Sequence, residues 1–136
     1  MRKLSLFTAF LSLALIAAAP ARAGAPDIEA RYTQAFKTCP GMDRSTMEMI
    51  GCIDAEHAVQ DKALNATYQK ILADLTEAQK AKLRAAQRAW IAYRDTWCAA
   101  QQDEAWGSIS TIVAANCVLD ETIRRTIELE HYPPET

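Results

Sequence analysis

The sequence has few of the residues from which most catalytic and metal sites are built. It contains only two histidines, His57 and His131, and neither has a nucleophile beside it. Its four cysteines form no C-x-x-C pair and have no histidine pair nearby, which argues against a zinc site and against thioredoxin-type exchange. The serines lack the G-x-S-x-G and S-x-x-K contexts of nucleophilic serines. We therefore predict no enzyme, with no catalytic residue, no metal site and no cofactor.

Strand-like alternation of apolar and polar residues is also missing from residue 24 onward. Apolar residues instead recur every three or four positions, the spacing of a helix with one buried face. No repeat, low-complexity tract or internal linker interrupts this part of the chain. We predict an all-α fold, a small single domain in which an antiparallel helical hairpin is joined by a third helix.

The first residues resemble a targeting signal. Two basic residues precede an apolar run over 4–19, and Ala21-Arg22-Ala23 then forms a small-x-small cleavage site. The run could instead be a membrane anchor, but a helix needs roughly 20 apolar residues to span a bilayer. We predict a signal peptide over 1–23, a domain over 24–136 that is periplasmic or secreted, and no membrane span after cleavage.

The domain that remains after cleavage is acidic. It keeps 12 basic and 17 acidic residues, so the formal net charge moves from −2 to −5. A surface of this charge repels nucleic acids and anionic membranes and attracts cationic proteins. We expect a protein partner and no nucleic acid.

Two capping boxes predict the starts of long helices. Ser45 and Thr76 are each followed three residues later by Glu or Gln, a pattern typical of a helix N-terminus. The first helix is expected to end at Asp74, and the second to run from residue 77 to a point before Gly107. Glycine there can adopt the left-handed conformation that ends a helix. A third helix is expected to begin near Ser110.

The position of the hairpin turn predicts the disulfides. If the turn centres near Leu75, residues that face each other across the hairpin have numbers adding up to about 150. Cys52 then faces Cys98, which leaves Cys39 to pair with Cys117. Two such bridges would suit a small domain exported to an oxidising compartment.

The same register places Glu56 opposite Arg94. We interpret the two as an ion pair that fixes the helices in register. The alternative is that Glu56 and Asp61 form a carboxylate couple of the glycosidase kind. Five residues separate them on one helix, however, so they lie on different faces and do not converge on a substrate.

The three tryptophans are expected to differ in exposure. Trp90 and Trp97 are two helical turns apart on one face, which favours packing in the core. Trp106 precedes Gly107 at the end of a helix and is expected to be exposed.

Three motifs resemble a known family. They are D-x-x-L-N-x-x-Y from Asp61, A-Q-R-A-W-I-x-Y-R-D-x-x-C from Ala86 and T-x-x-R-x-x-x-L from Thr122. Together they resemble the LprI-like lysozyme inhibitor family over about Cys39 to Leu129. The motif residues that we interpret as structural are Asp61, Leu64, Asn65, Tyr68, Gln87, Trp90, Tyr93, Arg94, Asp95 and Arg125.

The resemblance implies a small exported helical domain that inhibits lysozyme by protein–protein contact, with a basic lysozyme as partner. The alternative is an adaptor module of the cell envelope without inhibitory activity. The candidate contact segments are the connections 38–44 and 106–110, because loops on a rigid scaffold commonly carry recognition. An apolar patch on one helix would favour the adaptor, and a loop-built or acidic protrusion would favour the inhibitor.

Overall fold

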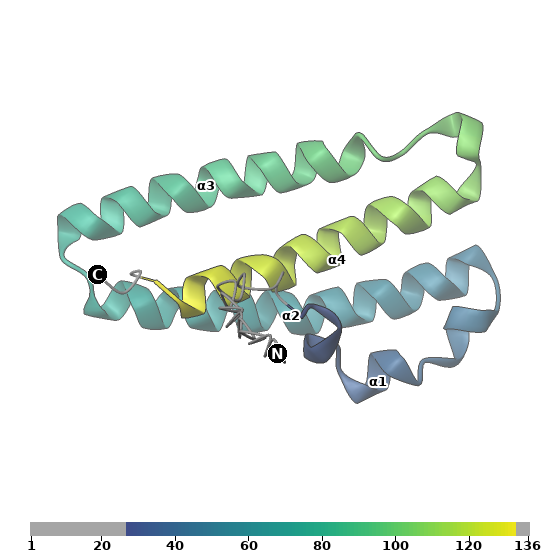
Figure 1. Ribbon diagram of the computed structural model, residues 1–136, viewed down its shortest axis with the longest axis horizontal. Coiled ribbons are helices and arrows are strands. Elements are labelled where there is room, and N and C mark those ends of the chain that lie inside the picture. Colours follow the sequence, from purple (N-terminus) through teal and green to yellow (C-terminus); the bar gives the residue numbers. More distant parts are fainter. Residues whose placement is uncertain (1–26, 133–136) are drawn as a thin grey trace, which may run out of the picture.

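The computed structural model describes residues 27–132, so the predicted signal peptide lies outside the described residues. All regular structure in that range is helical (Figure 1), which confirms the all-α prediction. Three long helices dominate it: α2 (Thr46–Asp74), α3 (Glu77–Ala99) and α4 (Ser108–Glu130). The short helices are η1 (Glu29–Arg31), α1 (Gln34–Lys37), η2 (Pro40–Asp43) and η3 (Glu104–Trp106). No described helix is both long and apolar enough to cross a membrane.

Capping boxes begin α2 and α3, as predicted. The Ser45 hydroxyl accepts a hydrogen bond from the Glu48 amide, and the Glu48 carboxylate accepts one from the Ser45 amide. Thr76 and Gln79 exchange the same two bonds at the start of α3. Each box satisfies backbone amides that the first helical turn leaves without partners. The extended Leu75 between the helices confirms the position of the turn.

The third helix lies between the first two (Figure 1). α4 packs along most of α2 and makes a smaller contact with α3. α2 and α3 meet near the turn, where Leu64, Leu83 and Leu129 form a buried cluster. Farther from the turn, within residues 27–132, α2 and α3 do not pack on each other to a comparable extent. α2 and α3 therefore stand apart over most of their length, and α4 packs between them.

A second apolar cluster holds α2 to α4. It is formed by Ile53, Ile112, Leu119 and Ile123, and Ile53 and Leu119 are completely buried. The chain before α2 covers this cluster with partly buried Ile28, Tyr32 and Phe36. The N-terminal segment, residues 27–38, is thus packed against the core.

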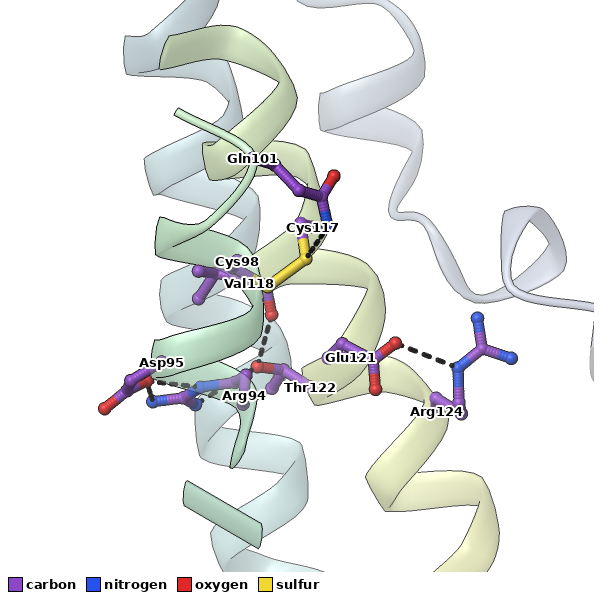
Figure 2. The surroundings of a disulfide bond; sticks show 9 residues. All are labelled: Arg94, Asp95, Cys98, Gln101, Cys117, Val118, Glu121, Thr122 and Arg124. Carbon is purple, nitrogen blue, oxygen red and sulfur yellow. Dashed lines mark hydrogen bonds and ion pairs between the residues drawn. A yellow bond between two sulfur atoms is a disulfide. The ribbon is translucent and has the colours of Figure 1, made fainter. Parts of the chain in front are cut away.

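The predicted disulfide pairing is wrong. Cys39 is bonded to Cys52, and Cys98 is bonded to Cys117 (Figure 2). The prediction assumed that α2 and α3 face each other directly. Because α4 lies between them, Cys98 meets α4 and Cys52 meets the residue before η2. Each bridge closes a short span, of 13 and 19 residues.

Two of the three tryptophan predictions are confirmed. Trp90 is partly buried against the Leu64 cluster, and Trp106 is 59% exposed. Trp97 is 50% exposed, so the prediction that it packs in the core is wrong. α3 contacts its neighbours through a narrow stripe that includes Leu83 and Cys98, the only residues of α3 that are buried. Trp97 stands beside that stripe.

Candidate protein-contact site

The two connections predicted to make contacts lie at the same end of the molecule (Figure 1). The first contains η2, which the Cys39–Cys52 disulfide holds against the start of α2. The second opens α4, and its Ser108 hydroxyl accepts a hydrogen bond of 3.3 Å from the Thr46 hydroxyl in the first turn of α2. We call residues 38–48 and 102–111 together the loop end.

Large apolar side chains are exposed on the loop end. Met47 is 80% exposed, Trp106 59% and Ile109 54%. Met47 and Ile109 directly follow Thr46 and Ser108, whose hydrogen bond joins the first turns of α2 and α4. Exposed apolar side chains gathered in one region of a small domain mark an interaction site.

The loop end is also acidic. Asp43, Glu48, Asp103 and Glu104 outnumber its one basic residue, Arg44, whose guanidinium is paired with Glu48 at 3.3 Å. Hydrogen bonds from the side chain and the backbone of Ser45 lower the pKa of Glu48. The apolar residues therefore lie within a field of negative charge.

Local hydrogen bonds and one glycine shape the second half of the loop end. Asp103 caps η3 by accepting a hydrogen bond of 2.8 Å from the Ala105 amide. Gly107 has φ +61° and ψ −149°, a region that residues with a side chain rarely adopt. The predicted positive φ is present, but the prediction that Gly107 ends the second long helix in a left-handed helical conformation is wrong. Its ψ lies outside that region, α3 already ends at Ala99, and Gly107 joins η3 to α4. Beside it, an open hollow of about 530 Å³ is lined by residues that include Gln102, Asp103 and Glu104.

Motif residues of α3 and α4 meet around one aromatic ring. The guanidinium carbon of Arg94 lies 5.0 Å from the ring centroid of Trp90, and that of Arg125 lies 5.7 Å from it. The side-chain oxygen of Gln87 accepts a hydrogen bond of 3.0 Å from Arg125 Nε. The contacts of Arg125 with Trp90 and Gln87 tie α4 to α3, whereas the contact between Arg94 and Trp90 lies within α3. Both arginine side chains are largely covered by the protein.

The other motif residues occupy four different settings. Asp95 pairs with the neighbouring Arg94 at 2.8 Å (Figure 2). On α2, Asn65 donates hydrogen bonds to the backbone and carboxylate of Asp61, one turn earlier. Leu64 and Tyr68 belong to the apolar cluster near the turn, whereas Tyr93 is 54% exposed. The structure therefore does not bring all the motif residues together in one site.

The predicted ion pair between Glu56 and Arg94 is wrong. Glu56 is 2% exposed and its carboxylate accepts hydrogen bonds from the Thr33 amide at 2.9 Å, the Thr33 hydroxyl and the Gln60 amide group at 2.7 Å. Arg94 lies against Trp90 instead, because α4 separates the two helices. Glu56 thus fastens the N-terminal segment to α2.

Further contacts of the N-terminal segment could not be read from the sequence. The Tyr32 hydroxyl donates to Asp120 of α4, and Arg31 forms a bidentate pair with Glu130 at 2.6 and 3.0 Å. The one indication was Glu56, a polar residue at a position predicted to face another helix. In residues 27–132, no three potential metal ligands gather closely enough to hold an ion.

The chain matches the family described as "Lysozyme inhibitor LprI" over residues 39–129. It belongs to this family. The matched part of the LprI domain runs from the first cysteine to the last buried residue of α4, and it contains both disulfides and all three long helices. The N-terminal segment, up to residue 38, precedes the match.

One curated relative of this LprI chain carries no assigned function. It is the uncharacterized protein R02472 of Rhizobium meliloti (strain 1021), which is 31% identical over 134 residues, covering 88% of this chain and 89% of that protein. No solved structure matches the chain. Membership in LprI indicates an inhibitor rather than an enzyme, with a protein as its partner. Together with two disulfides, it also indicates a location outside the cytoplasm.

Proposed function

We propose that this protein is an exported inhibitor of lysozyme that acts by protein–protein contact in the periplasm or outside the cell. The observation that carries the proposal is the LprI match over residues 39–129, which spans the whole three-helix scaffold. The sequence over 1–23, with its basic start, apolar run and small-x-small site, supports cleavage and export of the domain over 24–136.

The scaffold suits an inhibitor because its loops are held before binding. Cys39–Cys52 fixes η2 to α2, and Cys98–Cys117 fixes the end of α3 to α4. A loop already ordered in the free protein loses little conformational entropy on association. We further propose that the motif residues around Trp90 maintain this scaffold, since Arg125 of α4 contacts both Trp90 and Gln87 of α3.

The test is a turbidity assay with the mature protein and several types of lysozyme. We expect slower lysis of peptidoglycan-bearing cells as the protein approaches equimolar amounts with at least one basic lysozyme. An unrelated helical protein of the same net charge is the control for non-specific electrostatic effects. Lysis that proceeds unchanged at a several-fold molar excess with every lysozyme type would contradict the proposal.

The second candidate is an envelope adaptor, and one observation favours it. Tyr93 and Trp97, four residues apart on the exterior of α3, are 54% and 50% exposed. Residues at this spacing form a continuous stripe on a helix, which suits a docked partner helix. If the wild-type protein inhibits no lysozyme, the adaptor becomes the better explanation of this stripe.

A further inference from the structure

We infer that the loop end is the surface that binds the inhibited enzyme, with Trp106 as the apolar anchor and a basic protein surface as the occupant. This inference rests on the proposed function and assigns its contact site. The argument uses three properties of the loop end: its charge relative to the rest of the surface, its rigidity, and the exposure of its apolar residues.

The loop end differs in charge from the outer face of α3, which also exposes large apolar side chains. The loop end has four carboxylates and one basic residue, whereas α3 has five basic residues and two acidic ones. Four of the five basic residues of α3 lie between 80 and 88, and the charged residues beside Tyr93 and Trp97 are Arg94 and Asp95, which pair with each other at 2.8 Å. A cationic protein is therefore attracted to the loop end and gains no comparable attraction at the outer face of α3. A basic lysozyme would therefore meet the loop end and not the stripe of Tyr93 and Trp97.

The hollow near the hairpin turn offers a basic partner no comparable attraction. It has a volume of about 540 Å³, and its charged lining residues are Lys70, Asp74 and Glu130. Glu130 is already engaged by Arg31, whose hydrogen bonds lower the pKa of that carboxyl. The lining of this hollow therefore keeps one carboxylate outside an ion pair, Asp74, whereas the loop end, with Glu48 paired to Arg44, keeps three: Asp43, Asp103 and Glu104.

The apolar residues of the loop end have the arrangement of a binding hot spot. Trp106 follows Asp103 and Glu104 by two or three residues, so a large aromatic surface stands next to negative charge. An arginine or lysine of the partner could stack on the indole ring while it pairs with a carboxylate. Tryptophan anchors ringed by polar groups dominate the energy of many interfaces.

Both halves of the loop end would contribute to the contact. The hydrogen bond between Thr46 and Ser108 joins the first turn of α2, which carries Met47, to the first turn of α4, which carries Ile109. The two disulfides and the Asp103 cap hold these segments in place before binding. Changes on α2 and in the connection to α4 should therefore weaken the same complex.

Two matched pairs of variants test the assignment, with the dissociation constant for a basic animal lysozyme measured by titration calorimetry alongside turbidity. Glu104→Lys and Asp74→Lys change the net charge equally but at opposite ends of the molecule. Trp106→Ala and Trp97→Ala each remove a half-exposed tryptophan, from the loop end and from α3. We expect the two loop-end variants to weaken binding at least tenfold and the two controls to stay within about twofold.

Met47→Lys provides a test that does not depend on the η3 turn. This side chain is 80% exposed and is not needed for folding, so any loss of binding reports the contact. We expect a loss of tenfold or more, with an unchanged circular dichroism spectrum and melting temperature.

The outcomes separate the two proposals. If the wild-type protein neither binds nor inhibits, the proposed function fails and the contact site fails with it. If the wild-type protein inhibits while the loop-end variants behave like their controls, only the assignment of the loop end is overturned. Weakening by Trp97→Ala or Asp74→Lys alone would place the contact on α3 or at the hairpin turn.

Discussion

Glu56 is a buried carboxylate that is stabilised by hydrogen bonds without a cation. Three donors from Thr33 and Gln60 satisfy it, and the side chain of Gln60 also donates to the Arg31 carbonyl at 2.8 Å. Burial of a charged group is tolerable only when its hydrogen bonds are complete. Glu56 thus joins the Arg31–Glu130 pair, the Tyr32–Asp120 hydrogen bond and the packing of Ile28 and Phe36 in holding the N-terminal segment on the core.

Glu56→Ala should therefore cost much more than Glu56→Gln. The alanine leaves the donors of Thr33 and Gln60 buried without an acceptor, at about 2–3 kcal/mol. In the glutamine variant, the side-chain oxygen can still accept hydrogen bonds from the Thr33 backbone amide and the Gln60 side chain, and the side-chain NH2 group can donate to the Thr33 hydroxyl. Urea denaturation of the three proteins measures the difference, and equal losses for the two variants would contradict this account.

Tyr32 predicts a loss of stability in alkaline solution. Burial, followed by the hydrogen bond to the Asp120 carboxylate, raises the pKa of the Tyr32 phenol above its usual value. The resulting stabilisation is complete below the unfolded-state pKa of about 10 and is lost as the pH rises towards the folded-state value. Tyr32→Phe should be less stable than wild type at pH 8, and the gap should narrow by pH 11.

Thermal unfolding at several pH values measures that gap. The comparison between wild type and variant cancels the contributions of lysines and the other tyrosines. A gap that stays constant from pH 8 to pH 11 would mean that the phenol does not titrate differently in the two states.

At the scale of elements, each disulfide should stabilise a different part of the fold. Replacing Cys98 and Cys117 by serine frees the end of α3 from α4, and replacing Cys39 and Cys52 frees η2 from α2. The chain-entropy estimate for either short loop is about 3 kcal/mol. We expect faster hydrogen exchange in the last turns of α3 for the first double variant, and around residues 38–44 for the second.

Peptide mapping under non-reducing conditions is the accompanying control. It should find Cys39 with Cys52 and Cys98 with Cys117. If both double variants loosen the same region, the bridges do not act on separate elements.

Local signals in the sequence were sufficient to predict where the helices begin and end, but not which helices pack against each other. Ser45, Thr76 and the turn at Leu75 could be predicted because capping is decided by residues three positions apart. The predicted register of the hairpin was wrong because the register depends on which helices pack against each other. That choice is made by apolar residues such as Ile53 and Ile123, far apart in sequence, and no local pattern encodes it.

The candidate contact site shows the same division between local and distant information. Trp106 was predicted to be exposed from its place at a helix end, and the two connections were predicted as contact segments. The two connections meet because α2 packs along α4, and the hydrogen bond between Thr46 and Ser108 joins residues 62 positions apart. The N-terminal segment was missed because its anchors, Glu56 and Asp120, are distant in sequence from it.

At the scale of the whole molecule, opposite charges are segregated onto different surfaces. The loop end is acidic and α3 is basic, so the protein has a dipole in addition to its net charge. Association with a basic lysozyme should slow markedly as salt rises from 0.01 M to 0.15 M, because the Debye length falls from about 30 Å to about 8 Å. Stopped-flow fluorescence measures this rate, and a rate indifferent to salt would remove the electrostatic part of the proposal.

The insertion of α4 between α2 and α3 determines when the protein can fold. α2 and α3 cannot complete a core with each other, since both apolar clusters draw residues from α4, which follows them in the chain and is the last helix of residues 27–132. A fragment over 27–107 is therefore expected to unfold without a cooperative transition, because isolated helices of this kind gain most of their stability from tertiary packing. Residues 27–107 thus stay unfolded until α4 is available, a delay that suits a polypeptide exported before it folds.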